Sequence, residues 1–205
     1  MDPPFRWGDE LPVLSSSRIA LRWLRDGDAE AIFTIFRDPA VMRYWSSASL
    51  TEMADAAELI REVHEMFRSR TLFQWGVATR SEDAVIGTST LFHLDPIHRR
   101  AEIGFALGSR HWGQGLATEA VELLIGFAFE ALELHRLEAD VDPRNERSLR
   151  LLERQGFVRE GLLRERYHAE SEVQDTVFLG LLRREWKRPP ASPNPRGNDP
   201  APARL

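Results

Sequence analysis

Two glycines, Gly113 and Gly115, stand in the stretch RHWGQGLATEA (residues 110–120), between an apolar run typical of a strand and one typical of a helix. Glycine adopts positive φ at little cost and lets the backbone approach a ligand closely. A helix start adds free N–H groups and the positive end of the helix dipole. The pattern indicates either a seat for an anion such as a pyrophosphate or a plain strand-to-helix turn.

Two more specific phosphate motifs fit this stretch poorly. A Walker loop needs a lysine after its second glycine, and Leu116 stands there. A dinucleotide-binding turn needs a third glycine, and Thr118 stands in its place. Asp140 and Asp142 lie at a suitable distance for a ribose contact, but the strands predicted before residue 110 do not suit a doubly wound sheet. We exclude the first motif and keep the second as the weaker alternative.

Composition excludes several classes of protein. The net charge of −5 argues against a nucleic-acid binder that neutralises phosphates. The chain has no cysteine, so it has no thiolate nucleophile and no cysteine-ligated metal. His93, His98, His111 and His168 show no metal-ligand spacing. No apolar run reaches the ~20 residues of a membrane span. We expect a cytoplasmic protein with no metal and no membrane partner.

Hydrophobic periodicity predicts one α+β domain over residues 17–187, with an N-terminal extension (1–16) and a disordered, proline-rich tail (188–205). Connections of three to six residues join the strands predicted between residues 71 and 107, so these strands form an antiparallel meander. Ser49 and Glu52 have the spacing of a capping box at the start of a helix.

After residue 110 the pattern changes to helix, strand and helix. The largely apolar helix over 116–134 separates strands 101–107 and 135–142, which indicates a parallel, right-handed pair. Asn145 is placed to cap the next helix, and Gly156 to end it with Phe157 making the accompanying apolar contact. Residues 157–167 and 173–186 predict a closing hairpin, where a homodimer interface is plausible.

Four stretches in this order, AEIGFAL, RHWGQGLATEA, RLEADVDPRNERSLRLLERQGF and REGLLRERY, resemble the GNAT superfamily of N-acetyltransferases. The similarity is greatest to its RimJ/RimL branch, which acetylates the N-termini of ribosomal proteins. The resemblance implies a splayed, mostly antiparallel mixed sheet with flanking helices. It also implies that acetyl-CoA lies between the two parallel strands, with its pyrophosphate on the amides of residues 110–118.

The resemblance assigns the coenzyme to residues of the first parallel strand, of the glycine stretch that follows it and of the starts of the two helices. These residues are Phe105, Leu107, Arg110, Gly113, Gln114, Gly115, Leu116, Ala117, Thr118 and Asn145. Arg144 and Arg147 are candidates for the 3′-phosphate of CoA, with ordinary surface arginines as the alternative. Residues 43–45 (RYW) fall where this family forms its acceptor pocket, and Trp45 is equally suited to the core.

Alternation along residues 101–107 places Glu102 on one face with the small Gly104 and Ala106, where the pantetheine arm has room to lie. Glu102 is the candidate general base, with a solvent-facing glutamate as the alternative. A base deprotonates an α-amine, with a pKa of ~8, more easily than a lysine amine, with a pKa of ~10.4. Ser148 is a candidate acid toward the leaving thiolate, or a small polar filler.

One position departs from the family pattern. Many members have a tyrosine as general acid four residues before the glycine of GF, and Leu152 stands there. The expected activity is direct transfer of acetyl from acetyl-CoA to the primary amine of a protein N-terminus or a small molecule. The alternatives are a CoA-binding sensor or scaffold without efficient catalysis and, more remotely, a nucleotide-binding domain.

Overall fold

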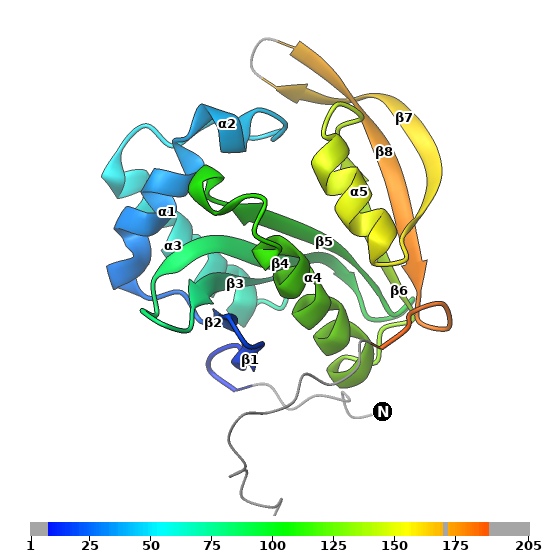
Figure 1. Cartoon of the computed structure of the whole chain (residues 1–205), viewed down its shortest axis with the longest axis horizontal. Coiled ribbons are helices and arrows are strands. Elements are labelled where there is room, and N and C mark those ends of the chain that lie inside the picture. Colours follow the sequence, from blue (N-terminus) through cyan, green and yellow to red (C-terminus); the bar gives the residue numbers. More distant parts are fainter. Residues whose placement is uncertain (1–7, 170–171, 189–205) are drawn as a thin grey trace, which may run out of the picture.

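A computed structural model describes residues 8–169 and 172–188, and Figure 1 shows its arrangement. The described residues form an eight-stranded sheet in the order β1-β2-β3-β4-β5-β6-β8-β7. The strands are β1 (Leu14–Ser15), β2 (Ile19–Arg22), β3 (Leu72–Thr79), β4 (Val85–Asp95), β5 (Arg100–Leu107), β6 (Arg136–Val141), β7 (Val158–Ala169) and β8 (Glu172–Leu182). The helices are α1 (Ala29–Phe36), α2 (Pro39–Met42), α3 (Met53–Arg68), α4 (Leu116–Gly126) and α5 (Glu146–Arg154).

Strand pairing confirms the predicted change of topology. Strands β1 to β5 are antiparallel neighbours, whereas β5 and β6 run parallel. Their pairing covers only Arg100↔Arg136, Ala101↔Leu137 and Glu102↔Glu138. Beyond these pairs β5 continues alongside β4 and β6 alongside β8, so the two strands separate and the sheet splays. The mixed, mostly antiparallel α+β fold is confirmed, and the topology rules out a doubly wound sheet.

Two apolar clusters hold helices on the sheet. The larger one buries the apolar side of α4 and α5 against β3, β5, β6 and β8. The smaller one packs α1, α2 and α3 against side chains that include Ala78, Val85 and Ala106. Figure 1 shows α4 and α5 in front of the strands and α3 behind them. The helices therefore flank the splayed strands from both faces.

Helix boundaries differ from expectation at two places. The predicted capping pair of Ser49 and Glu52 is wrong, because α3 begins at Met53, and Asp55 accepts the amide of Glu52 at 2.9 Å. The helix predicted over 116–134 is α4 followed by a π-helical turn, Phe127–Ala131. In contrast, Gly156 has φ +94° after α5, and Phe157 is buried beside it, as predicted.

Residues before position 17 contribute to the fold. Leu11 is 3% exposed within the larger cluster, and β1 pairs with β2. The indole Nε1 of Trp75 donates to the carbonyl of Pro12 at 2.9 Å. The segment expected as an extension therefore supplies an edge strand and part of the core. The tail predicted to be disordered lies outside the described residues, apart from Arg188.

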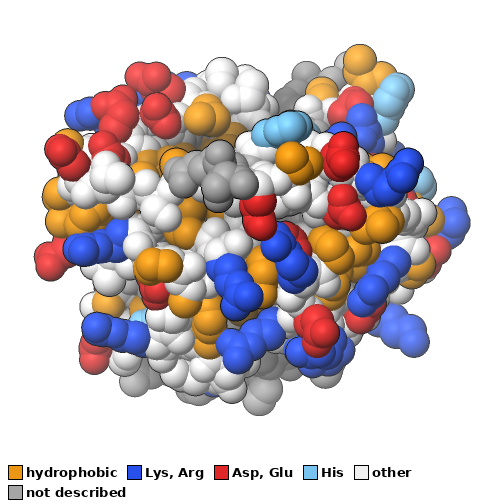
Figure 2. Space-filling model, turned by 90° about the horizontal axis from the view of Figure 1, so that it is seen from above, with side chains coloured by type: hydrophobic (Ala, Val, Ile, Leu, Met, Phe, Trp, Pro, Cys, Tyr) orange, Lys and Arg blue, Asp and Glu red, His pale blue; other side chains and the backbone are white. Residues whose placement is uncertain are grey.

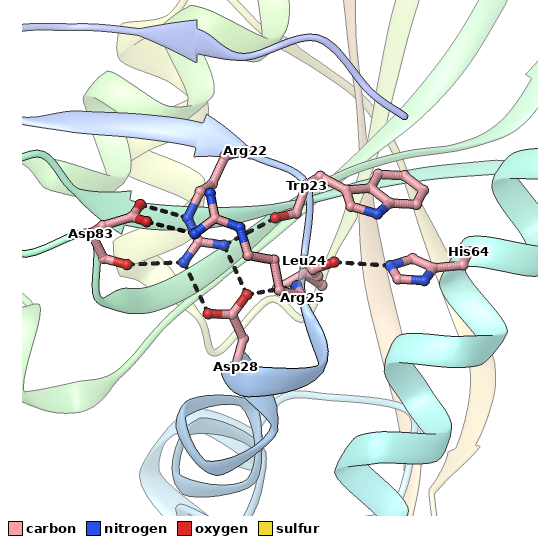
Figure 3. A network of polar contacts seen from close by, with 7 residues as sticks. All are labelled: Arg22, Trp23, Leu24, Arg25, Asp28, His64 and Asp83. Carbon is pink, nitrogen blue, oxygen red and sulfur yellow. Dashed lines mark hydrogen bonds and ion pairs between the residues drawn. The ribbon is translucent and has the colours of Figure 1, made fainter. Parts of the chain in front are cut away.

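A buried ion network fixes the chain between β2 and α1 (Figure 3). Arg22, which is 5% exposed, donates to both oxygens of Asp28 at 2.8 and 2.9 Å and to Asp83 at 2.6 Å. The exposed Arg25 also pairs with Asp83, at 2.7 Å. Because Asp83 lies in the β3–β4 turn, this network joins the start of the α1 layer to the sheet.

Seen from above, charged side chains of both signs are interspersed with apolar ones (Figure 2). Many arginines pair with carboxylates, as Arg136 does with Glu138 and Glu160.

Within residues 8–169 and 172–188 no helix is long and apolar enough to cross a membrane.

Candidate active site

The glycine loop presents free backbone to solvent. Gly113 and Gly115 have φ of +75° and +79°, a conformation that only glycine adopts without strain. Gly115 is the N-cap of α4, and no side chain of the described residues caps this helix. A Cβ on Gly113 would have no atom within 4 Å. The loop and the helix start therefore fit a phosphate group that approaches the amides from outside.

Contacts from both sides hold this loop in place. Arg18 donates to Glu119 at 2.5 Å and to the carbonyl of Gln114 at 2.9 Å. The indole Nε1 of Trp112 donates to the carbonyl of Leu107 at 2.6 Å, and the Arg147 guanidinium lies 5.3 Å from the centre of the Trp112 ring. The starts of α4 and α5 are thereby brought to the same end of the splayed strands.

Asn145 caps α5, as the sequence predicts. Its Oδ1 accepts the amide of Ser148 at 3.2 Å. Both residues stand in the first turn of α5, one strand away from the glycine loop, because α5 follows β6 and α4 follows β5. The start of α5 therefore follows the end of β6 at which β5 and β6 have separated.

The two faces of β5 have different surroundings. Ile103, Phe105 and Leu107, which were predicted to share one face, belong to or pack against the larger cluster, which contains the apolar side of α4. Ala106, on the opposite face, is 6% exposed and buried among α1 and α3 residues, so the open strip expected along Gly104 and Ala106 is wrong at Ala106. At Gly104, a Cβ would come within 3.3 Å of the Phe92 ring. The Phe92 ring therefore packs close to Gly104 on this face.

Glu102 lies at the last paired position before β5 and β6 separate, and its side chain is only 8% exposed. The alternative of a solvent-facing glutamate is therefore excluded. Its Oε2 is 2.9 Å from Nδ1 of His93. Burial raises the pKa of the Glu102 carboxyl above its ordinary value, the His93 contact opposes this, and the nearby carboxylate of Asp140 adds to the increase. A carboxylate in this state is suited to accept a proton.

His93 reaches Glu102 because β4 is irregular there. The β4–β5 register shifts between Phe92 and Asp95, and His93 has φ +48°. A bulge of this kind changes the direction of a side chain and is common beside active sites. Nothing in the spacing of His93 in the sequence indicated this contact.

A family model for the acetyltransferase (GNAT) domain matches residues 18–158. The chain is 34% identical over 176 residues to the N-acetyltransferase p20 of Bacillus licheniformis, covering 86% of this chain and 99% of that protein. It superposes with a TM-score of 0.74 on the crystal structure of spermidine N-acetyltransferase from Vibrio cholerae in complex with CoA and spermine, at 25% identity over 83% of this chain and 98% of that one. A ribosomal-protein-S5-alanine acetyltransferase from Vibrio fischeri has the same fold, with a TM-score of 0.75 and 23% identity over 86% and 100% of the chains.

The chain belongs to the GNAT acetyltransferase family. As a GNAT protein it is an acetyl-CoA-dependent N-acetyltransferase, and acetyl-CoA is its cosubstrate. The splay between β5 and β6 and the free amides of the glycine loop fit such a cosubstrate. Among the residues that the structure describes, no group of three or more His, Cys, Asp or Glu side chains is arranged to hold a metal ion.

In this GNAT fold, several candidates have structural roles. Arg144 donates to Asp142 at 2.6 Å and to Glu172 at 2.7 Å, so it is committed to an ion-pair network and not free for a phosphate. Trp45 packs edge-on against Phe36, with ring centroids 5.5 Å apart, in the smaller cluster. Leu152 is fully buried in the larger cluster. The Leu152 side chain is therefore part of the core of this GNAT protein.

Sequence reasoning missed a second buried carboxylate beside Glu102. Asp140 of β6, considered only as a ribose ligand, has a side chain that is 4% exposed. Its Oδ2 accepts from the hydroxyl of Tyr167 at 2.8 Å and lies 3.5 Å from Nε of Arg166. Burial, reinforced by the hydrogen bond to Asp140, raises the pKa of Tyr167 to about 12. Because Tyr167 lies on β7, only the folded sheet brings it to β6.

Proposed function

We propose that this chain transfers the acetyl group of acetyl-CoA to one primary amine, that of a protein N-terminus or of a small molecule, by direct attack within a ternary complex. The observation that carries the proposal is Glu102, a carboxylate buried at the end of the β5–β6 pairing with its pKa raised. A general base is most effective when its pKa approaches the working pH.

The proposed reaction releases two protons from the acceptor nitrogen. The acceptor arrives as an ammonium ion, and Glu102 takes one of its protons. The resulting amine forms a C–N bond with the thioester carbonyl carbon, the C–S bond breaks and CoA leaves as a thiolate, and the second proton passes from the nitrogen to water. A thiol of pKa near ~8.5 leaves acceptably without an acid, which suits a protein with leucine at position 152. Ser148 stays our candidate for protonating the sulfur.

Charge pairing around the site favours a single amine over a polyamine. Glu138, which faces Glu102 across the strand pair, contacts Arg100 at 2.9 Å and Arg136 at 2.8 Å. Arg144 likewise neutralises Asp142 and Glu172. A second ammonium group would have to displace an arginine from one of these pairs. We therefore favour a protein N-terminus, in keeping with the RimJ/RimL branch, over spermidine.

Release of free CoA thiol, measured against alaninamide, alanyl peptides, n-butylamine and spermidine, tests the proposal. We expect turnover of at least one monoamine, with a larger kcat/KM than for spermidine. Thiol release that stays at the rate of spontaneous hydrolysis across the panel would overturn it. Tight CoA binding by calorimetry in that case would favour the alternative, a CoA-binding sensor without efficient catalysis.

A further inference from the structure

Two buried polar atoms on the face of the sheet that carries Glu102 have no hydrogen-bond partner among the described residues: Oδ1 of Asp140 and Oγ1 of Thr176. Asp140 is opposite Phe178 in the β6–β8 ladder, and Thr176 lies two residues from Phe178 on the same face of β8. Asp140 and Thr176 are thus diagonal neighbours across two strands. Thr176 is 2% exposed.

A buried polar atom without a partner costs free energy, so natural proteins rarely retain one without a reason. Here a carboxylate oxygen and a hydroxyl oxygen, both able to accept hydrogen bonds, have no partner and lie on the same face of the sheet. Glu102 interacts electrostatically with Asp140, which places a second carboxylate close by. The group that would satisfy these acceptors is a cation with several N–H donors.

The two carboxylates have different partners. Asp140 accepts a hydrogen bond from the Tyr167 hydroxyl on its other oxygen, which also lies 3.5 Å from Nε of Arg166. Among the described residues, the side-chain partner of Glu102 is His93. The Asp140 carboxylate is thus held in place by two side chains, whereas that of Glu102 is held by one. The Arg166 side chain is 45% exposed and is the part of the cluster that can rotate to admit a ligand.

We propose that Asp140 Oδ1, assisted by the Thr176 hydroxyl, binds the ammonium group of the acceptor and holds it beside Glu102. This inference rests on the proposed function and deepens it. Asp140 binds the cation, Thr176 supplies a second acceptor, and Tyr167 positions Asp140 through the hydrogen bond to its other oxygen.

The test uses Asp140→Asn, Thr176→Val and Tyr167→Phe in the full chain, with Glu65→Gln on the exposed face of α3 as the matched charge control. The probes are whichever of alaninamide and n-butylamine the wild type acetylates faster, its N,N-dimethyl derivative and its hydroxyl analogue. The dimethyl derivative carries a positive charge and one N–H but has no acetylation product, whereas the hydroxyl analogue is neutral. Inhibition constants of both against the wild type and each variant measure recognition of charge.

We expect wild type and Glu65→Gln to bind the cationic inhibitor at least tenfold better than the neutral one. Asp140→Asn should weaken the cation by about 10- to 100-fold, the range for hydrogen bonds to charged groups, without changing binding of the neutral analogue or of CoA. Thr176→Val and Tyr167→Phe should each weaken binding of the cationic inhibitor by a smaller factor than Asp140→Asn does.

An unchanged preference for the cation in Asp140→Asn, with CoA affinity at the wild-type level, would overturn the inference while wild-type turnover upholds the proposed function. Loss of binding of the neutral analogue to the same extent would show a merely structural role and would also overturn it. If circular dichroism shows that Asp140→Asn does not fold, the ratio of the inhibition constants of the cationic and neutral analogues is measured in Thr176→Val and Tyr167→Phe instead. A ratio equal to that of the wild type in both variants would overturn the inference. Absence of any wild-type turnover would overturn both proposals together.

Discussion

Replacing Gly113 and Gly115 together by alanine tests the coenzyme seat. Both residues have left-handed φ, and an L-residue in that region costs about 1–2 kcal/mol. Around Gly113 the space beside the backbone is open, and at Gly115 a Cβ would lie 3.2 Å from the flexible Arg18 side chain. The cost is therefore mainly backbone strain. At about 2–4 °C per kcal/mol for a domain of this size, each substitution should lower Tm by about 2–8 °C.

The effect on acetyl-CoA should exceed the effect of strain alone. An alanine that relaxes to negative φ turns an N–H away from the ligand, and one that keeps positive φ at position 113 puts a methyl group into the open space beside the loop. Loss of one charge-assisted hydrogen bond is worth about 1.5–3 kcal/mol. We expect the dissociation constant for acetyl-CoA to rise about 10- to 100-fold, measured by calorimetry at a temperature well below the Tm of the variant.

Gly156 is the matched control. It has φ +94° after α5, and a Cβ there would meet Leu181 at 3.4 Å, an ordinary contact. Gly156→Ala should lower Tm by a similar amount and leave acetyl-CoA affinity at the wild-type value. If the double variant at positions 113 and 115 binds acetyl-CoA within twofold of wild type despite its lower Tm, the assignment of the pyrophosphate to this loop is wrong.

Three further substitutions test the base, the ion network and the core. Glu102→Gln should lower kcat by about 10²–10⁴-fold. In the wild type, kcat/KM should fall at acid pH because protonation disables the base, and the midpoint should lie above the ordinary carboxyl pKa because burial raises the pKa of Glu102. The variant should lack this fall. The same substitution should raise Tm at neutral pH. A buried carboxyl with a raised pKa stabilises the folded state while it is protonated, and this contribution is lost as pH rises, whereas glutamine has no charge to bury. A kcat near the wild-type value would refute the role of Glu102 as the base. Asp28→Ala leaves the buried Arg22 without its bidentate partner and should cost about 3–5 kcal/mol in urea unfolding, whereas Arg25→Ala removes an exposed contact and should cost about 0–1 kcal/mol; equal losses would show that burial does not set the cost. Leu152→Ala should cost about 2–5 kcal/mol from the cavity it leaves while acetyl-CoA affinity stays unchanged, and a shift in that affinity would mean that this side chain reaches the coenzyme.

Local patterns were sufficient for much of the fold. The alternating strands, the short turns between them and the long apolar helix after residue 115 predicted an antiparallel meander followed by a parallel crossover, and the strand pairing agrees. The caps at Asn145 and Gly156 were also predicted, because capping depends on residues within one turn of each other. The start of α3 was not, because two overlapping cap patterns, Ser49–Glu52 and Glu52–Asp55, compete there.

The sequence by itself determined the glycine loop, the order of the elements and the face of β5 on which Glu102 stands, since each depends on neighbours along the chain. Only the tertiary structure decided that Glu102 is buried, that the bulge in β4 brings His93 to it, and that Tyr167 of β7 contacts Asp140 of β6. Residues so far apart in sequence are neighbours only through strand register and the point where β5 and β6 separate. The pKa and hydrogen-bonding needs of these groups depend on burial in that assembled environment, which no single segment carries.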